Sequence, residues 1–233
     1  MKRVITCCLS TWLAVTVYYG MKRTTLLALL LVGLAAPAGA QSPSPYSQRA
    51  LARLAQNVAA DQELPDSLRR LTATELLALP ESGYVNLLSD SQASDFMQVM
   101  AATLHQLPDS LCGRFLQTGQ SKPDLAMMFA LIDSATVDRW TVIVEQIVRA
   151  VAGSQPPGRA ASPDEIRAAN VAVITAMDAE RRQRMGWIAQ HPPPSSADAC
   201  WAMQIILDGM SQLPPPQLGP VVRANFGAPQ RSQ

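Results

Sequence analysis

The sequence predicts an all-α protein, built as a multi-helix bundle or as a short stack of helical repeats of about 43 residues. Apolar residues recur at spacings of three and four, which is the period of one face of an α-helix. No run alternates apolar and polar residues with the β-branched enrichment of a strand. Apolar side chains make up 48% of the 233 residues and charged ones 16%, a composition typical of globular chains and not of disordered ones.

The first 40 residues have the pattern of a cleaved secretory signal. Residues 22–40 contain a basic pair, a short apolar run and small residues spaced Ala-x-Ala up to Ala40. We expect cleavage after Ala40 and a free, soluble product in the periplasm or outside the cell. Met-Lys-Arg at residues 1–3 recurs at residues 21–23, so we expect translation to start at Met21. Residues 1–20 are then untranslated; if Met1 is the start, they extend the leader or form a short anchor.

The charge and cysteine content narrow the possible partners. From residue 41 onward, 15 basic residues stand against 18 acidic ones, a balance that gives no reason to expect binding to nucleic acid. No cysteine stands at the expected cut site, so we expect no lipid anchor and no stable membrane attachment. Cys112 and Cys200 are the two cysteines left after cleavage, and in an oxidising compartment they are expected to form a disulfide. The alternative is two separate buried thiols.

After a proline-rich lead-in over residues 41–46, we expect a single all-helical domain over residues 47–233. Within this domain, apolar residues at helical spacing form stripes, each of which indicates one face of a helix. The first two consist of Phe96, Met97, Met100, Leu104 and Leu107, and then of Val137, Trp140, Ile143, Val144, Ile147, Val148 and Val151.

Two further helical stripes follow in the second half of the chain. One runs from residue 162 to residue 190 behind Ser162-Pro163-Asp164-Glu165, a typical helix start with a capping serine and early acids. The other covers residues 197–210. Loops with proline or glycine are expected at residues 153–158, 191–196 and 213–216, where two triple prolines favour stiff connectors.

An internal repeat is suggested at an offset of 43 residues. Leu-Pro-Asp-Ser-Leu at residues 64–68 recurs at residues 107–111, and Asp-Ser at residues 90–91 recurs at residues 133–134. A period of this size is typical of two- or three-helix units that stack. The alternative is convergence, because Pro-Asp-Ser and Asp-Ser are also common helix starts.

Few residues have the pattern of a catalytic or metal site. His105 and Asp109 stand four residues apart but are separated by Pro108, and His191 precedes three prolines. Both histidines are expected as cationic residues at helix ends. No His-Glu-x-x-His, Gly-x-Ser-x-Gly or glycine-rich phosphate loop occurs, so the sequence predicts no cofactor, no metal site and no catalytic residues.

The densest basic cluster consists of Arg181, Arg182 and Arg184. Asp178 and Glu180 lie beside it, so a solvated face is one interpretation and a contact for a partner or an anion is the other. Arg181 lies on the apolar stripe of its helix, where a buried guanidinium would need a carboxylate or an anionic ligand. The favoured alternative is that the Arg181 side chain extends to the surface.

We therefore expect a periplasmic or secreted helical protein with a non-enzymatic role, which binds an envelope protein or peptide through a helix face or groove. One alternative is a hydrolase or metal-assisted enzyme that uses His105, Asp109 and His191. The other is a carrier for a lipid or apolar small molecule, which an enclosed apolar cavity would mark.

Overall fold

The computed structural model describes residues 44–80, 82–118, 128–191 and 195–227, and over these residues the chain is helical with no strand, as the sequence predicted. The expected leader and its cleavage site lie outside the described residues. The elements are α2 (Pro45–Ala60), α3 (Asp66–Arg69), α4 (Ala73–Leu77), η1 (Tyr84–Leu87), α5 (Asp90–Gln106), α6 (Asp109–Thr118), α8 (Ser134–Ala152), α9 (Pro163–Ala176), α10 (Ala179–Gln190), α11 (Ser196–Ser211) and α12 (Pro215–Phe226). Among the described helices, none combines the length and apolar character needed to cross a membrane.

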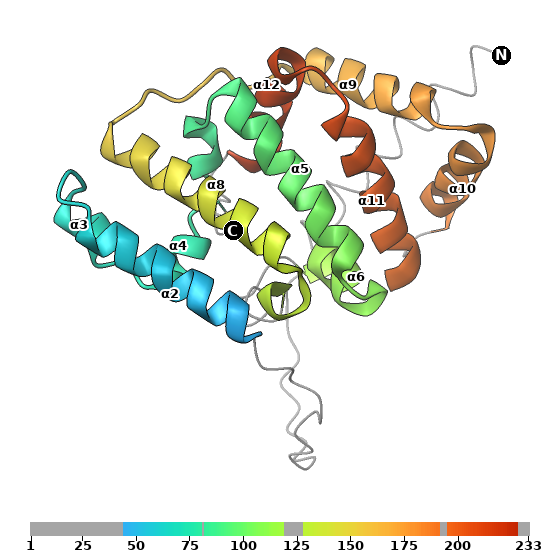
Figure 1. The fold of residues 1–233 in the computed structure, drawn as a ribbon. Coiled ribbons are helices and arrows are strands. Elements are labelled where there is room, and N and C mark those ends of the chain that lie inside the picture. Colours follow the sequence, from blue (N-terminus) through green and yellow to red (C-terminus); the bar gives the residue numbers. More distant parts are fainter. Residues whose placement is uncertain (1–43, 81, 119–127, 192–194, 228–233) are drawn as a thin grey trace, which may run out of the picture. The chain divides into compact units, whose positions relative to one another are not determined.

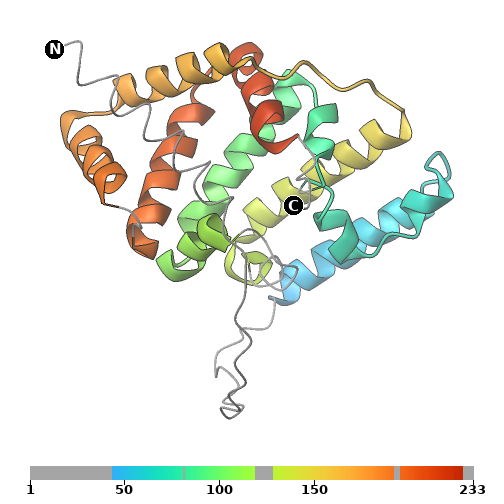
Figure 2. The same cartoon turned by 180° about the vertical axis from the view of Figure 1, so that it is seen from behind.

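Residues 178–191, which include α10, belong to one compact unit, and the other described residues form a second, larger unit. In the larger unit, α5 packs against α8, α11 and α12 (Figure 1; Figure 2 shows the same helices from behind). Ser89 caps α5 in a capping box with Gln92. The predicted stripe from Phe96 to Leu107 is buried throughout, so α5 lies at the core of this unit.

The predicted stripe on α8 faces the same core. Asp133 caps this helix by accepting a hydrogen bond from the backbone N–H of Thr136, which lowers the pKa of the Asp133 carboxyl. The Trp140 indole donates to the Thr103 hydroxyl at 2.8 Å in the buried interface with α5. Its ring also meets Phe96 edge to face at 5.9 Å between centroids. These contacts set the position of α8 against α5.

Helix α2 begins inside residues 41–46, which we expected to be a proline-rich lead-in before the helical domain. Ser44 caps the helix by accepting from the backbone N–H of Ser47, and Pro45 occupies the first helical turn, where its missing N–H removes no intrahelical bond. The Ser47 hydroxyl donates to the Phe129 carbonyl at 2.6 Å, and the Tyr46 hydroxyl donates to the Asp138 carboxylate. The start of α2 is therefore tied to the start of α8.

The loop expected over residues 213–216 is shorter in the structure, because a helix begins before residue 216. Helix α12 begins at Pro215 behind Pro214, because proline is tolerated in the first turn of a helix. The helix also contains Pro220 in its interior. No apolar stripe in the sequence analysis indicated this helix, although it packs on α5 with Leu218, Val221 and Val222 buried.

The stripe expected from residue 162 to residue 190 is divided between two helices. The capping box of Ser162 and Glu165 starts α9 as predicted. The backbone at Met177 is extended, and Asp178 then caps α10 by accepting from the backbone N–H of Arg181 at 2.8 Å. A second N-cap signal inside the apolar periodicity therefore ends one helix and starts another.

The disulfide between Cys112 and Cys200 is present as expected and joins α6 to α11, with 5.3 Å between the two Cα atoms. Both cysteines are fully buried. Beside them, a Cβ added to Gly113 would lie 2.5 Å from the Cα of Ser196, so glycine allows the two helices to approach this closely. The disulfide and the close approach of Gly113 to Ser196 therefore lie at the same contact between α6 and α11.

The suggested repeat of 43 residues corresponds to helix starts but not to matching helices. Asp66 begins α3, which has 4 residues, whereas Asp109 begins α6, which has 10. Ser89 caps α5 with Asp90 inside the helix, whereas Asp133 is itself the cap of α8. The duplication stays a prediction.

Candidate functional site

The candidate site lies between the end of α2 and the second half of α8, which pack side by side (Figure 1). Asp61 ends α2, and its backbone N–H donates to the Asn57 carbonyl. The chain then turns through Leu64 toward α3, which leaves a cavity of about 370 Å³ against α8. We call this cavity the α2–α8 site; it is lined by Asn57, Val58, Ala60, Asp61, Leu64, Glu145, Val148 and Arg149.

The floor of the α2–α8 site is apolar. Val58, Leu64 and Val148 are 4%, 6% and 1% exposed, so they belong to the core and line the cavity with the little surface they keep. Val148 belongs to the buried stripe of α8, and Val58 lies one turn after the buried Leu54 of α2. Because the floor is part of two packed helices, the cavity is preformed.

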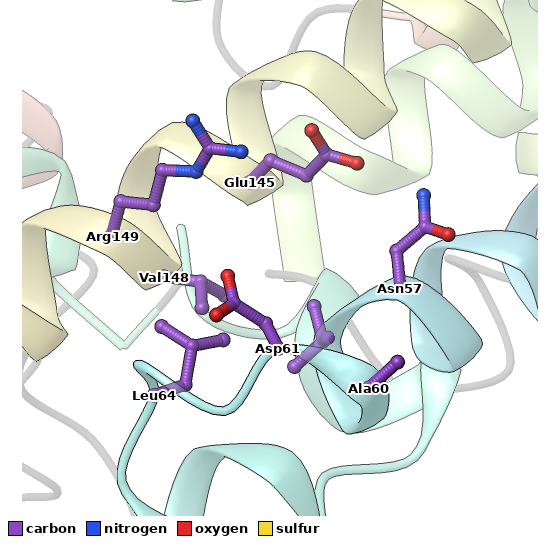
Figure 3. A pocket seen from close by; sticks show the side chains of 8 residues that line it. Asn57, Ala60, Asp61, Leu64, Glu145, Val148 and Arg149 are labelled. Atoms are coloured by element: carbon purple, nitrogen blue, oxygen red, sulfur yellow. The ribbon is translucent and has the colours of Figure 1, made fainter.

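The rim of the α2–α8 site is polar and charged. Figure 3 shows Glu145 and Arg149 extending from α8, with Asn57 and Asp61 on the side of α2. Within the described part of the chain, the side chains of Asn57, Glu145 and Arg149 make no hydrogen bond or ion pair. Asp61 accepts one hydrogen bond, from the backbone N–H of Glu63 at 3.0 Å.

The spacing of Glu145 and Arg149 makes their lack of mutual contact informative. Residues four apart on a helix commonly form an ion pair when their charges are opposite. Here no such pair forms, although both side chains line the same cavity. The rim therefore offers a guanidinium, two carboxylates and a carboxamide whose hydrogen-bonding capacity is largely open to a ligand.

A second cleft, of about 530 Å³, lies where α12 meets the segment before α5 and the loop after α8. Its charged groups are already paired inside the protein. Arg223 is 5% exposed and donates to the carbonyls of Leu88 and Arg159 at 2.9 and 2.8 Å, and it forms an ion pair with Asp90. At the edge of the cleft, Arg159 pairs with Glu165 at 2.7 Å. These pairs hold the protein's own segments together and leave few charged groups that a ligand could contact.

His105 does not pair with Asp109. It lies in the last turn of α5, as expected, and its Nε2 lies 2.9 Å from each carboxylate oxygen of Asp208 on α11. Both side chains are nearly half exposed. Asp109 lies in the first turn of α6, where its negative charge interacts favourably with the positive end of the helix dipole. The contact of His105 is an exposed interaction between two helices, and the pair with Asp109, which Pro108 made unfavourable, does not form.

His191 follows the end of α10. Its ring stacks on Trp187 with 4.5 Å between centroids, and its Nδ1 lies 2.8 Å from the Trp187 carbonyl. Both contacts are local, across one turn of helix. In the part of the chain that the structure describes, no group of three or more His, Cys, Asp or Glu side chains is placed to hold a metal ion.

The arginine cluster lies on the exposed surface of α10. Arg181, Arg182 and Arg184 are all exposed. Arg181 pairs with the Asp178 carboxylate at 3.3 Å, with more than half of both side chains exposed. The Arg181 side chain is at the surface, as the favoured alternative predicted, because the break at Met177 removes this residue from the apolar stripe. An anion contact at the cluster stays a prediction.

The sequence did not predict the rim residues of the α2–α8 site. The apolar stripe of α8 indicates its core face, whereas the polar residues Glu145 and Arg149 lie beside that stripe and carry no motif. A charged pair at helical spacing beside a buried stripe was a usable signal. The pairing of α2 with α8 was not, because it joins segments about 90 residues apart and depends on the whole fold.

The α2–α8 site combines an apolar floor, a charged rim and side chains open to a ligand. Comparison with known proteins identifies no relative, since no family model, no curated protein and no solved structure matches this chain.

Proposed function

We propose that this chain is an exported, non-catalytic binding protein, and that the α2–α8 site holds a segment of a peptide or protein partner. The observation that carries the proposal is the rim itself. Around one cavity, Asn57, Glu145 and Arg149 keep side chains that no other described residue satisfies. Polar groups grouped in this way above an apolar floor are typical of binding sites.

Export is supported by the leader pattern and by the disulfide. Residues 22–40 have the three parts of a secretory signal. Cys112 and Cys200 form a buried disulfide, a bond that persists in the periplasm or outside the cell and is rare in the cytosol. A partner in the cell envelope is therefore the proposed ligand.

The size of the site favours a short segment of a partner. The cavity lies near the lower end of the 300–1,000 Å³ typical of small-ligand sites, so it accommodates a few side chains and not a folded domain. The two clefts described above are both lined by charged residues, whereas a lipid carrier needs an enclosed apolar cavity. A polar peptide fits the lining of the α2–α8 site better than a lipid does.

The test is selection of peptides on the purified protein from a random library, followed by calorimetric titration of the selected peptides. We expect Arg149→Met and Glu145→Gln each to weaken binding by about tenfold, because each removes a charge-assisted hydrogen bond. Arg139→Met is the matched control on the same helix, since Arg139 is exposed and lies outside the cavity. It is expected to change affinity by less than about twofold.

Circular dichroism and thermal unfolding check that the three variants fold, which surface substitutions usually permit. Selected peptides that bind both rim variants with the affinity of the unsubstituted protein would contradict the proposal. A library that yields no binding peptide at all would contradict it as well.

A further inference from the structure

The chemistry of the rim also indicates what part of a peptide the site takes. We propose that the α2–α8 site recognises the free amino terminus of a peptide whose first side chain is aliphatic. This inference rests on the proposed function and names its ligand class.

The two carboxylates supply the first argument. Asp61 and Glu145 line the cavity from opposite helices, and Glu145 has no cationic partner in the described residues. With Arg149 as the one cation of the lining, the rim carries a net charge of −1. An ammonium group is the peptide group that carboxylates hold best, because it donates three hydrogen bonds and carries the opposite charge.

The amide and the guanidinium supply the second argument. The Asn57 carboxamide both donates and accepts hydrogen bonds, as a peptide bond does, so it can pair with the first peptide group of the ligand. Arg149 donates only and carries a charge, which suits the carbonyl oxygen of that group or the carboxylate of a very short peptide. A peptide terminus thus uses every polar side chain of the rim.

The floor supplies the third argument. Val58, Leu64 and Val148 present apolar surface at the base of the cavity. A leucine or valine side chain covers that surface and is withdrawn from water, whereas a charged first residue would lose hydration without a partner there. The cavity of about 370 Å³ limits the contact to the first one or two residues.

The experiment compares three defined probes on the purified protein by calorimetric titration: leucyl-glycyl-glycine, its N-acetylated form and aspartyl-glycyl-glycine. We expect leucyl-glycyl-glycine to bind at least about tenfold more tightly than either of the others. The double variant D61N/E145Q is expected to lose the preference for the free ammonium. Asp95→Asn, an exposed acid on α5 outside the cavity, is the control and should keep that preference.

The outcomes separate this inference from the proposed function. Equal binding of the free and acetylated tripeptides overturns the inference, even if library peptides bind at the α2–α8 site. The inference is also overturned if leucyl-glycyl-glycine does not bind while selected library peptides bind the unsubstituted protein and fail to bind the rim variants. Loss of all peptide binding overturns both proposals. Equal binding of the leucyl and aspartyl peptides overturns the aliphatic preference.

Discussion

At the scale of single residues, Arg223 joins three segments that are distant in the sequence. From α12 it reaches the Leu88 carbonyl before α5, the Arg159 carbonyl in the loop before α9, and the Asp90 carboxylate. The close approach is permitted by Gly158, since a Cβ there would lie 2.8 Å from the Arg223 Nε. A buried guanidinium is stable only when acceptors such as these surround it. If the guanidinium is removed, each of these acceptors loses its hydrogen-bond donor.

Arg223→Met should therefore destabilise the protein strongly. Removing one member of a buried pair costs 3–5 kcal/mol, and because the Asp90 side chain is 42% exposed we expect the lower end, about 3 kcal/mol. Urea unfolding of Arg223→Met and of Arg139→Met, an exposed control expected to change by less than about 0.5 kcal/mol, measures the difference. Equal midpoints for the two variants would contradict the role assigned to Arg223.

Glu165 gives the protein a specific dependence on acid. The hydrogen bond from Arg159, with those from Ser162, lowers the pKa of Glu165 from 4.5 to about 2. A carboxyl whose pKa is lower in the folded state stabilises that state above its ordinary pKa and loses this effect as the pH falls through the folded value. Glu165→Gln should lower the melting temperature at pH 7, and the difference from the unsubstituted protein should shrink between pH 4.5 and pH 2. A difference that is constant over this range would contradict the pairing.

Some residue roles followed from the sequence and others did not. The disulfide between Cys112 and Cys200 could be predicted because they are the only two cysteines after residue 40. The placement of Arg181 on an apolar stripe was wrong, because one residue in an extended conformation, Met177, resets the helical register. The partner of His105 could not be found, since Asp208 lies 103 residues away and neither position has a distinctive motif.

At the scale of elements, helix starts were the most predictable features. The signal at Ser162-Pro163-Asp164-Glu165 produced a capping box, because serine and glutamate three residues apart satisfy two backbone N–H groups at a helix start. The cap at Asp178 was not predictable from periodicity, since the apolar period continues across it. The prolines that suggested a loop instead begin α12, whose apolar face is short.

The break between α9 and α10 predicts a local effect of one substitution. Asp178→Ala removes both the cap on the Arg181 N–H and the ion pair with the Arg181 guanidinium. A lost N-cap costs about 1 kcal/mol, so the first turn of α10 should fray. Hydrogen exchange should be about fivefold faster at the amides of residues 180–182. Asp164→Ala, an exposed acid in the first turn of α9 that is not its cap, is the control. Unchanged exchange in Asp178→Ala would show that Asp178 does not hold the start of α10.

At the scale of the whole molecule, the sequence predicted the class of fold but not the pairing of its helices. Periodicity reports which face of a helix is buried, and that information identified the core faces of α5 and α8. It does not report which helices meet. The α2–α8 site depends on such a meeting, between residues near 60 and residues near 149, so its four polar side chains could not be grouped beforehand.

The disulfide is the strongest long-range constraint in the larger unit. It spans 88 residues, and restricting an unfolded chain over such a distance stabilises the folded state by about 4–5 kcal/mol in the chain-entropy description. The double variant C112S/C200S should unfold at a lower urea concentration by a corresponding amount. Reducing agent should lower the midpoint of the unsubstituted protein and leave that of the double variant unchanged. Two titratable thiols in the oxidised, exported protein would contradict the bond itself.

The proposed binding of a peptide at the α2–α8 site is tested most directly by a nuclear magnetic resonance titration of the isotope-labelled protein with leucyl-glycyl-glycine. We expect the backbone amides whose signals shift to lie at residues 57–64 and 145–149, which contain the residues that line the cavity. Amides around the second cleft, such as that of Gly158, should stay unchanged. Shifts confined to the second cleft or to α10, or no shifts at millimolar peptide, would contradict the claim.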